Sequence, residues 1–327
     1  MTPGLSIITT VYKSAGTIAE FTTRALAAAE KAGFEADLIV VDDGSPDASA
    51  NLVREIVDQD PRVRLVELSR NFGHHRAMLA GLEQATGDYV FLIDSDLEEP
   101  PELLIDMAQV MRDSPVDCLY GVQEARKGGF LERKSGELFY TLFSALSEVD
   151  LPRNVSTLRL MTGRYVKSLV SFRDKNPVFV PLSLLVGYAQ APFTFKKTST
   201  SATTYSLGRR FGLFLHAITS FSSRPLLLMF YVSLMLSAVG LIYGIYVVSL
   251  GLLGQPQDGW SSLMAVVVFF FSLNAVFTGL IGIYVKQVVE EVKDRPVSVV
   301  KEIYENPAAI RSEAQAPATD QKAGVAR

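Results

Sequence analysis

The stretch Phe91–Asp96, FLIDSD, is an apolar run that ends in two carboxylates one residue apart. Because side chains alternate between the two faces of a β-strand, Asp94 and Asp96 are expected to point the same way. Their hard oxygen ligands suit a divalent cation, Mg2+ or Mn2+, that also carries a diphosphate. The alternative is a strand followed by an acidic turn without a metal, since short motifs often occur by chance. The stretch therefore predicts a buried strand with a candidate metal site at its end.

A second acidic pair follows a second apolar run. The run is Leu38–Val41, and Asp42 and Asp43 come directly after it. In open α/β sheets, ligands bind beyond the carboxyl ends of parallel strands. The two acidic strand ends therefore predict one shared cleft.

Apolar runs of strand length alternate with segments of helical periodicity up to Asp113. This alternation favours parallel strands joined by right-handed crossovers, and hence an α/β fold with a mostly parallel sheet. The helix after Asp42 is predicted to start with Ser45 as its cap and Pro46 at the first helical position. The predicted strands are 5–10, 38–42, 63–68, 89–93, 118–122 and 156–161, the predicted helices are 15–32, 46–59, 73–85 and 101–113, and 177–197 is predicted as strand and loop.

The chain has 327 residues, 48% of them hydrophobic, and two segments account for this high fraction. Neither Pro225–Gly254 nor Ser261–Val285 contains a charged residue or a histidine. At about 1.5 Å per residue the shorter one reaches about 37 Å, more than the hydrocarbon core of about 30 Å. A buried helix of a soluble protein is the alternative, but two such runs in tandem exceed the usual length. We therefore predict transmembrane helices at about 225–253 and 261–285.

The charges around these two segments predict their orientation. The connection Gln255–Trp260 carries Asp258 and no Lys or Arg, whereas basic residues flank the pair on both sides. The positive-inside rule then predicts a multi-pass protein of the cytoplasmic (inner) membrane with both termini in the cytosol. We expect no cleaved signal, and the single Cys118 suits a reducing compartment. A net charge of −4 gives no reason to expect nucleic acid as a partner.

These patterns divide the chain into predicted parts. Amphipathic segments on both sides of the transmembrane pair are expected to rest in the membrane interface, and a further amphipathic helix is predicted at 131–146. The parts are a cytosolic domain at 1–206, an interfacial helix at 207–224, the two transmembrane helices within 225–289, a juxtamembrane helix at 286–305 and a disordered tail at 306–327.

Several motifs together resemble family-2 glycosyltransferases of the Rossmann-like GT-A fold. The matching stretches are DDGS at 42–45, SRNFG at 69–73, DSDLEEPPE at 94–102, ITSFS at 218–222 and EVKDRP at 291–296. The chain is similar to the branch that contains dolichol-phosphate mannosyltransferases and bacterial undecaprenyl-phosphate glycosyltransferases, over about Leu5–Tyr304. The resemblance implies metal-dependent, inverting transfer of a sugar from a nucleotide-diphosphate sugar to a polyprenyl phosphate.

The resemblance also implies roles for individual residues. Asp94 and Asp96 are expected to hold the metal and, with Arg159, to serve in catalysis. UDP is mildly preferred over GDP as the nucleotide by analogy. His74 and His75 are weaker candidates for contacts with the donor phosphates. The expected nucleotide-sugar-binding residues are Thr10, Val11, Tyr12, Asp42, Asp43, Asn71, Gly73, Asp94, Ser95 and Asp96.

The phosphate of the lipid acceptor needs cations, and guanidinium groups match phosphate oxygens. Arg159 is the first candidate. For each of the others, attraction to anionic lipid is an equally good explanation. The expected lipid-phosphate-binding residues are Arg126, Lys127, Arg133, Lys134, Arg159, Arg209 and Arg210.

Several positions depart from the family pattern. Thr157 stands where many relatives carry an Asp two residues before Arg159, and Thr204 stands where they carry Lys. In the turn after the first strand, Lys13 and Ser14 stand where relatives carry Asn and an acid. The change at position 157 removes a general base that the family pattern would supply. A phosphate monoester, with a second pKa of about 6, is already largely anionic at neutral pH and can dispense with that base.

Two other functions can be weighed against sugar transfer to a lipid phosphate. A processive polysaccharide synthase needs a channel of several helices, which two spans do not make. A catalytically silent nucleotide-sugar-binding scaffold would explain the departures at Lys13, Thr157 and Thr204, although both acidic pairs are intact. Gly240, Gly244 and Asn274 in the apolar segments are compatible with a homo-oligomer.

Overall fold

The computed structural model describes residues 2–124, 152, 154–197, 222, 224–252 and 259–306. The chain divides into two compact units. The first comprises 1–127, 152–202 and 296–327, and the second comprises 128–151 and 203–295. The predicted helix at 131–146, nearly all of the one at 207–224 and the tail beyond Asn306 lie outside the described residues.

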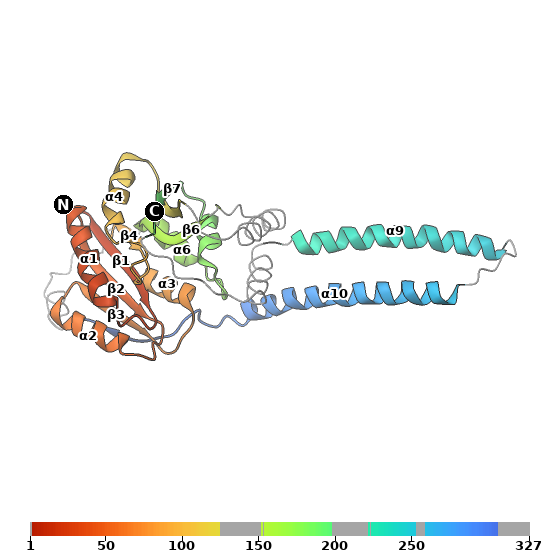
Figure 1. Ribbon diagram of the computed structural model, residues 1–327, viewed down its shortest axis with the longest axis horizontal. Helices are drawn as coiled ribbons and strands as arrows, with labels where there is room; N and C mark the ends of the chain where they lie inside the picture. The colour runs from red at the N-terminus through yellow and green to blue at the C-terminus, as the bar shows by residue number, and fades with distance from the viewer. Residues whose placement is uncertain are drawn as a thin grey trace, which may run out of the picture. The chain divides into compact units, whose positions relative to one another are not determined.

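The first unit is built on a sheet of eight strands, counted over the described residues, in the order β7-β5-β6-β4-β1-β2-β3-β8 (Figure 1). β1 pairs in parallel with β2 and β4, β2 with β3, and β5 with β7. β6 runs antiparallel to β4 and β5, and β8 runs antiparallel to β3. The predicted mostly parallel α/β fold is confirmed. The strands are β1 Gly4–Val11, β2 Glu35–Asp42, β3 Val63–Leu68, β4 Tyr89–Leu92, β5 Cys118–Gln123, β6 Val155–Thr162, β7 Gln190–Phe195 and β8 Val300–Tyr304.

Helices cover both faces of this sheet. Neighbouring residues of β1 point to opposite faces, so Ile7 and Ile8 belong to different apolar clusters. On the Ile7 face pack α1 (Ile18–Lys31), α2 (Ser49–Gln59) and α4 (Leu103–Asp113). On the Ile8 face pack α3 (His74–Leu82), α6 (Gly163–Ser171) and α7 (Phe179–Leu185). The central parallel strands are therefore buried on both sides, which is why they appear in the sequence as continuous apolar runs.

The strand order reverses next to β1. β2 and β3 follow on one side of β1, and the chain then returns to the other side to form β4. In open α/β sheets such a switch point opens a crevice at the carboxyl ends of the strands. Val11 ends β1 and Asp94 follows β4, so predicted site residues lie at this point.

The predicted juxtamembrane helix at 286–305 is wrong beyond Val292. Helix α10 (Trp260–Val292) ends at Val292, and the chain then forms β8 against β3. Pro296 cannot continue a helix, and the β-branched residues that follow it favour an extended chain. The chain thus leaves the sheet after β7, runs through the second unit, and returns to the same sheet as β8.

Two smaller predictions also need correction. Helix α2 begins at Ser49 and not at Pro46, because Asp47 Oδ1 accepts hydrogen bonds from Ser49 N at 3.2 Å and Ser49 Oγ at 2.6 Å and holds a turn there. The segment 177–197 contains helix α7 as well as strand β7. Its short apolar run Phe179–Leu185 packs against the sheet, and a run of this length does not distinguish a strand from a helix.

The described part of the second unit contains two long helices, α9 (Arg224–Leu252) and α10 (Figure 1). Both are long and apolar enough to cross a membrane, with a mean hydropathy of 2.2 over Arg224–Tyr243 and 1.5 over Phe269–Val292. Their apolar side chains are mostly exposed, for example Phe271 at 77%. The two predicted helices are confirmed as helices, and their passage through a membrane stays a prediction.

Candidate active site

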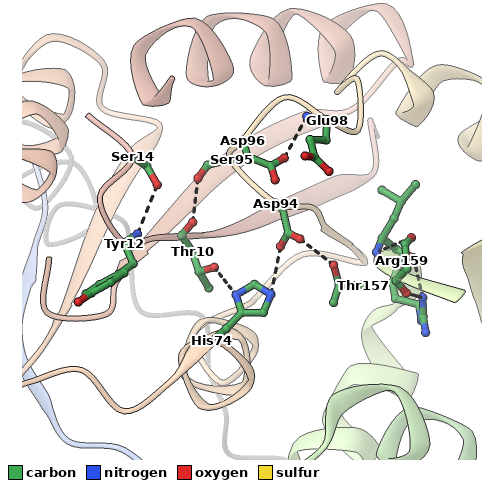
Figure 2. Close-up of polar contacts among 12 residues, drawn as sticks. Thr10, Tyr12, Ser14, His74, Asp94, Ser95, Asp96, Glu98, Thr157 and Arg159 are labelled. Atoms are coloured by element: carbon green, nitrogen blue, oxygen red, sulfur yellow. Dashed lines mark hydrogen bonds and ion pairs between the residues drawn. The ribbon is translucent and has the colours of Figure 1, made fainter. Parts of the chain in front are cut away.

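Hydrogen bonds join the loop after β4 to the end of β1. Ile93 N donates to Ile8 O at 3.1 Å, and the buried Ser95 Oγ donates to Thr10 O at 2.9 Å (Figure 2). Because β4 ends at Leu92, the acids after it project from a loop, and strand alternation does not set their directions as predicted. The loop is nevertheless fixed, since its middle residue is anchored to β1.

Asp94 is held by side chains from two other elements. Thr157 Oγ1, on β6, donates to Asp94 Oδ2 at 3.0 Å. His74 Nε2, at the start of α3, lies 3.4 Å from Asp94 Oδ1, and its Nδ1 lies 3.0 Å from Thr10 Oγ1. Figure 2 shows the Asp94 carboxylate turned toward these two partners. Strand β6 and helix α3 therefore converge on this one carboxylate, and β1 contacts the histidine through Thr10.

Asp96 is exposed, and its Oδ1 accepts a hydrogen bond from Glu98 N at 3.0 Å. Partial desolvation is the largest cause that raises its pKa, and the negative charges of Asp94 and Glu98 raise it further. Nearby negative charges disfavour the ionised form of a carboxylate, and a bound cation stabilises that form. This electrostatic environment fits a divalent cation between Asp94 and Asp96.

Over the described residues, no group of three or more His, Cys, Asp or Glu side chains is arranged to hold a metal ion by itself. Two carboxylates leave most positions of a hard cation open, and Mg2+ is commonly bound by one or two carboxylates together with substrate phosphates. The site therefore suits a cation that arrives with a diphosphate.

The second acidic pair organises the neighbouring loop. Asp43 Oδ1 accepts a hydrogen bond from Phe72 N at 2.7 Å, and Asp43 Oδ2 accepts one from Gly73 N at 3.0 Å. Asp42 accepts from Ser45 N. Burial raises the pKa of Asp43, against the lowering effect of the two N–H donors. The motifs DDGS and SRNFG therefore form one structural unit at the carboxyl end of β2.

Gly44 allows this unit to close. Its φ is +66°, and a Cβ at this position would lie 2.6 Å from Asn71 N and 2.7 Å from Arg70 C. Such distances are shorter than any side chain tolerates, so only glycine lets the backbone of the two loops approach.

Comparisons with known proteins agree with this arrangement. The family model for "Glycosyl transferase family 2" matches residues 6–173. A glycosyltransferase of Mycobacterium tuberculosis is 38% identical over 304 residues, 92% of this chain and 88% of that protein. The chain belongs to glycosyl transferase family 2. The predicted family and enzyme class are thereby confirmed.

The chain is also similar to a sequence relative and to a solved structure, at different levels of identity. The glycosyltransferase is 27% identical over 300 residues to an SfII prophage-derived bactoprenol glucosyl transferase of Shigella flexneri, which covers 91% of this chain and 97% of that protein. Crystalline glucosyl-3-phosphoglycerate synthase of Mycobacterium tuberculosis, in complex with Mn2+ and UDP-glucose, aligns at 19% identity and a TM-score of 0.48 over 68% of this chain and 79% of that chain. The second similarity is too low to transfer ligands to this glycosyltransferase.

The remaining nucleotide-sugar candidates of the glycosyltransferase lie near the same sheet edge but differ in exposure. Tyr12 is 47% exposed and Asn71 is exposed. Val11 is fully buried, and its carbonyl accepts hydrogen bonds from Asp43 N and Ser45 Oγ. The Val11 side chain is therefore closed to a donor, whereas Tyr12 and Asn71 have exposed side chains.

Arg159 does not occupy the position expected for a lipid-phosphate ligand. Its side chain is fully buried, Nη1 donates to Ser156 O at 2.6 Å and to Leu158 O at 2.8 Å, and the guanidinium lies 5.5 Å from the Tyr120 ring centroid. Burial lowers its pKa. The structure therefore does not agree with the prediction that Arg159 contacts an acceptor phosphate directly, because strand β6 turns this side chain into the protein interior. The other six candidates, Arg126, Lys127, Arg133, Lys134, Arg209 and Arg210, lie outside the described residues.

Two residues of the site carried no prediction of their own. Glu99 is 2% exposed, its Oε2 has no hydrogen-bond partner among the described residues, and burial, followed by the charge of Asp94, raises its pKa to about 7. Lys197 Nζ lies 2.8 Å from Glu98 Oε2 and brings a positive charge next to the acidic loop. The glutamates are part of the DSDLEEPPE motif, but nothing in their spacing shows which of them is buried.

Proposed function

We propose that this glycosyltransferase transfers a sugar, with inversion, from a nucleotide-diphosphate sugar to a polyprenyl phosphate at the cytosolic face of the membrane. The observation that carries the proposal is the acidic loop at the switch point of the sheet, anchored to β1 through Ser95 and Thr10. The 27% identical bactoprenol glucosyl transferase supports the acceptor, since bactoprenol is an undecaprenyl-type lipid. The two apolar helices α9 and α10 support a site that works beside a bilayer.

The donor would lie across the two motif units. Asp94 and Asp96 would hold Mg2+ or Mn2+, which when bound neutralises charge on the departing diphosphate. Asp43 fixes the backbone of Phe72 and Gly73. This fixed loop would face the nucleotide together with the exposed Tyr12. We propose UDP in preference to GDP as the nucleotide.

The acceptor needs no general base. A phosphate monoester, with a second pKa of about 6, is mostly ionised at neutral pH. One of its oxygens forms the bond to the anomeric carbon while the bond from that carbon to the diphosphate breaks, and the diphosphate leaves with the electron pair. Thr157 stands where many relatives carry an Asp. Its hydroxyl donates a hydrogen bond to Asp94 and takes no proton from the acceptor.

The test uses membranes that contain the full-length protein, undecaprenyl phosphate and a panel of labelled UDP- and GDP-sugars. We expect labelled lipid that extracts into organic solvent, that disappears with EDTA and returns with Mg2+ or Mn2+. Glu55→Gln, a change at an exposed residue of α2, serves as the control and is expected to behave as wild type. Label that stays in the aqueous phase with every donor would contradict the proposal and favour a silent nucleotide-sugar-binding scaffold.

A further inference from the structure

Both oxygens of the Asp94 carboxylate have a partner from a different element. Thr157 Oγ1 donates to Oδ2 at 3.0 Å, and His74 Nε2 lies 3.4 Å from Oδ1 (Figure 2). The terminal torsion of an Asp side chain is broad, so a carboxylate on a loop takes one orientation only when partners impose it. The hydroxyl of β6 and the imidazole of α3 impose it here.

Thr10 fixes the imidazole in turn. Its Oγ1 lies 3.0 Å from His74 Nδ1, and when this hydroxyl donates to Nδ1 the ring proton sits on Nε2, the nitrogen that faces Asp94. The carbonyl of the same Thr10 accepts from Ser95 Oγ at 2.9 Å. The end of β1 therefore orients both the loop that carries Asp94 and the side chain that holds it.

We propose that Thr157 and His74 are positioning residues, which hold the Asp94 carboxylate in the orientation that receives the divalent cation. This role rests on the proposed function, because the cation at Asp94 and Asp96 is part of that proposal. It assigns to Thr157 a function different from that of a general base. Removing the partners of a metal-binding side chain typically weakens metal binding about 10–100-fold.

The test is Mn2+ binding to the purified full-length protein in the presence of UDP, followed through the electron paramagnetic resonance signal of free Mn2+. Thr157→Val removes the hydroxyl with little change in shape, and we expect it to weaken binding about tenfold, whereas Thr157→Ser keeps the donor and stays within about twofold of wild type. His74→Ala is expected to weaken binding about tenfold, and His74→Gln to recover part of the loss, because its amide N–H can reach Asp94.

Thr162→Val provides the matched control on the same strand. Thr162 Oγ1 donates to Asp117 Oδ1 at 3.0 Å and accepts from Tyr165 N at the start of α6, away from Asp94. Its loss is expected to lower the melting temperature and to leave Mn2+ binding unchanged. In steady-state assays Thr157→Val should raise the Mn2+ concentration for half-maximal rate, and saturating Mn2+ should restore kcat. A structural role alone would not produce this separation.

Mn2+ binding by Thr157→Val and His74→Ala as tight as wild type, with unchanged melting temperatures, would overturn the positioning role. Absence of Mn2+ binding by the wild-type protein would overturn it as well. Failure of the proposed function gives a different result, namely no labelled lipid from wild-type protein with any donor in the panel.

Discussion

Asp96 is the residue whose loss should separate chemistry from folding. It is exposed, and its Oδ1 accepts a hydrogen bond from Glu98 N. Asp96→Asn keeps the shape, so the melting temperature should stay within about 1 °C, since surface changes rarely exceed about 0.5 kcal/mol. We expect the rate of lipid labelling at saturating Mn2+ to fall at least about 100-fold, because a ligand of the cation is lost. A normal rate in this variant would remove Asp96 from the mechanism.

Glu99 gives the glycosyltransferase a pH-dependent stability. Burial raises its pKa from an ordinary 4.5 to about 7, so between these values the folded protein binds a proton that the unfolded chain releases. The contribution of Glu99 to stability is therefore fully present below about pH 4.5 and is lost as the pH rises through 7, a loss of up to about 3 kcal/mol. Glu99→Gln, which resembles the protonated acid, should raise the melting temperature at pH 8 and leave it unchanged at pH 5. Equal effects at both pH values would show that Glu99 is ionised throughout.

At the scale of the elements, the contact between the DDGS and SRNFG loops depends on Gly44. Gly44→Ala places a Cβ 2.6 Å from Asn71 N, so the SRNFG loop must move away from Asp43. Gly33→Ala is the matched control, since its φ is +81° and nothing lies within 4 Å of the added Cβ. Both variants should lose about 1–2 kcal/mol from the positive φ. Only Gly44→Ala should also lose UDP binding, measured by calorimetry, and equal UDP affinities would contradict the role of this contact.

The last strand connects α10 to the same loop. Val299 O, just before β8, accepts a hydrogen bond from Ser69 N at 2.9 Å, where the SRNFG motif begins. Glu67 on β3 binds both Arg54 on α2 and Lys301 on β8, and it is nearly buried. Glu67→Ala leaves two cations without this partner and should loosen β8, at a cost of about 1–3 kcal/mol.

Trypsin measures this loosening directly, because it cleaves after Lys301 only when β8 leaves the sheet. We expect faster cleavage at Lys301 in Glu67→Ala than in wild type, and no change in the control Glu55→Gln. Cleavage at the wild-type rate would show that backbone pairing alone holds β8 in place.

The sequence predicted the elements whose burial is strong and local. The parallel strand 38–42 packs against apolar clusters on both faces, and this produces the run of consecutive apolar residues that is typical of a buried strand. β8 was missed because an edge strand is apolar on neither face, and its residues 300–303 are all exposed. The burial of Arg159 and the contact of Thr157 with Asp94 depend on how β6 pairs with β4, a long-range pairing that spacing along the chain does not reveal.

At the scale of the whole molecule, the apolar helices are an insertion within one folded sheet. β7 precedes α9 and β8 follows α10, and both strands belong to the sheet of the first unit. A folded sheet lies on one side of a membrane, so the chain between β7 and β8 must cross an even number of times. If α9 and α10 both span, as we propose, their connection lies on the opposite side from the sheet. This agrees with the distribution of basic residues around the two helices.

Cysteine labelling tests this arrangement with a membrane-impermeant maleimide. The single Cys118 is buried, so it should not react in the folded protein and can remain in place. Glu55→Cys lies on α2 at an exposed position of the first unit, and Gln255→Cys lies in the connection between the helices. We expect Gln255→Cys to react in intact spheroplasts and Glu55→Cys to react only in inverted vesicles, because the two positions lie on opposite sides of the membrane. Reaction of both positions from the same side would contradict the prediction that α9 and α10 span the membrane.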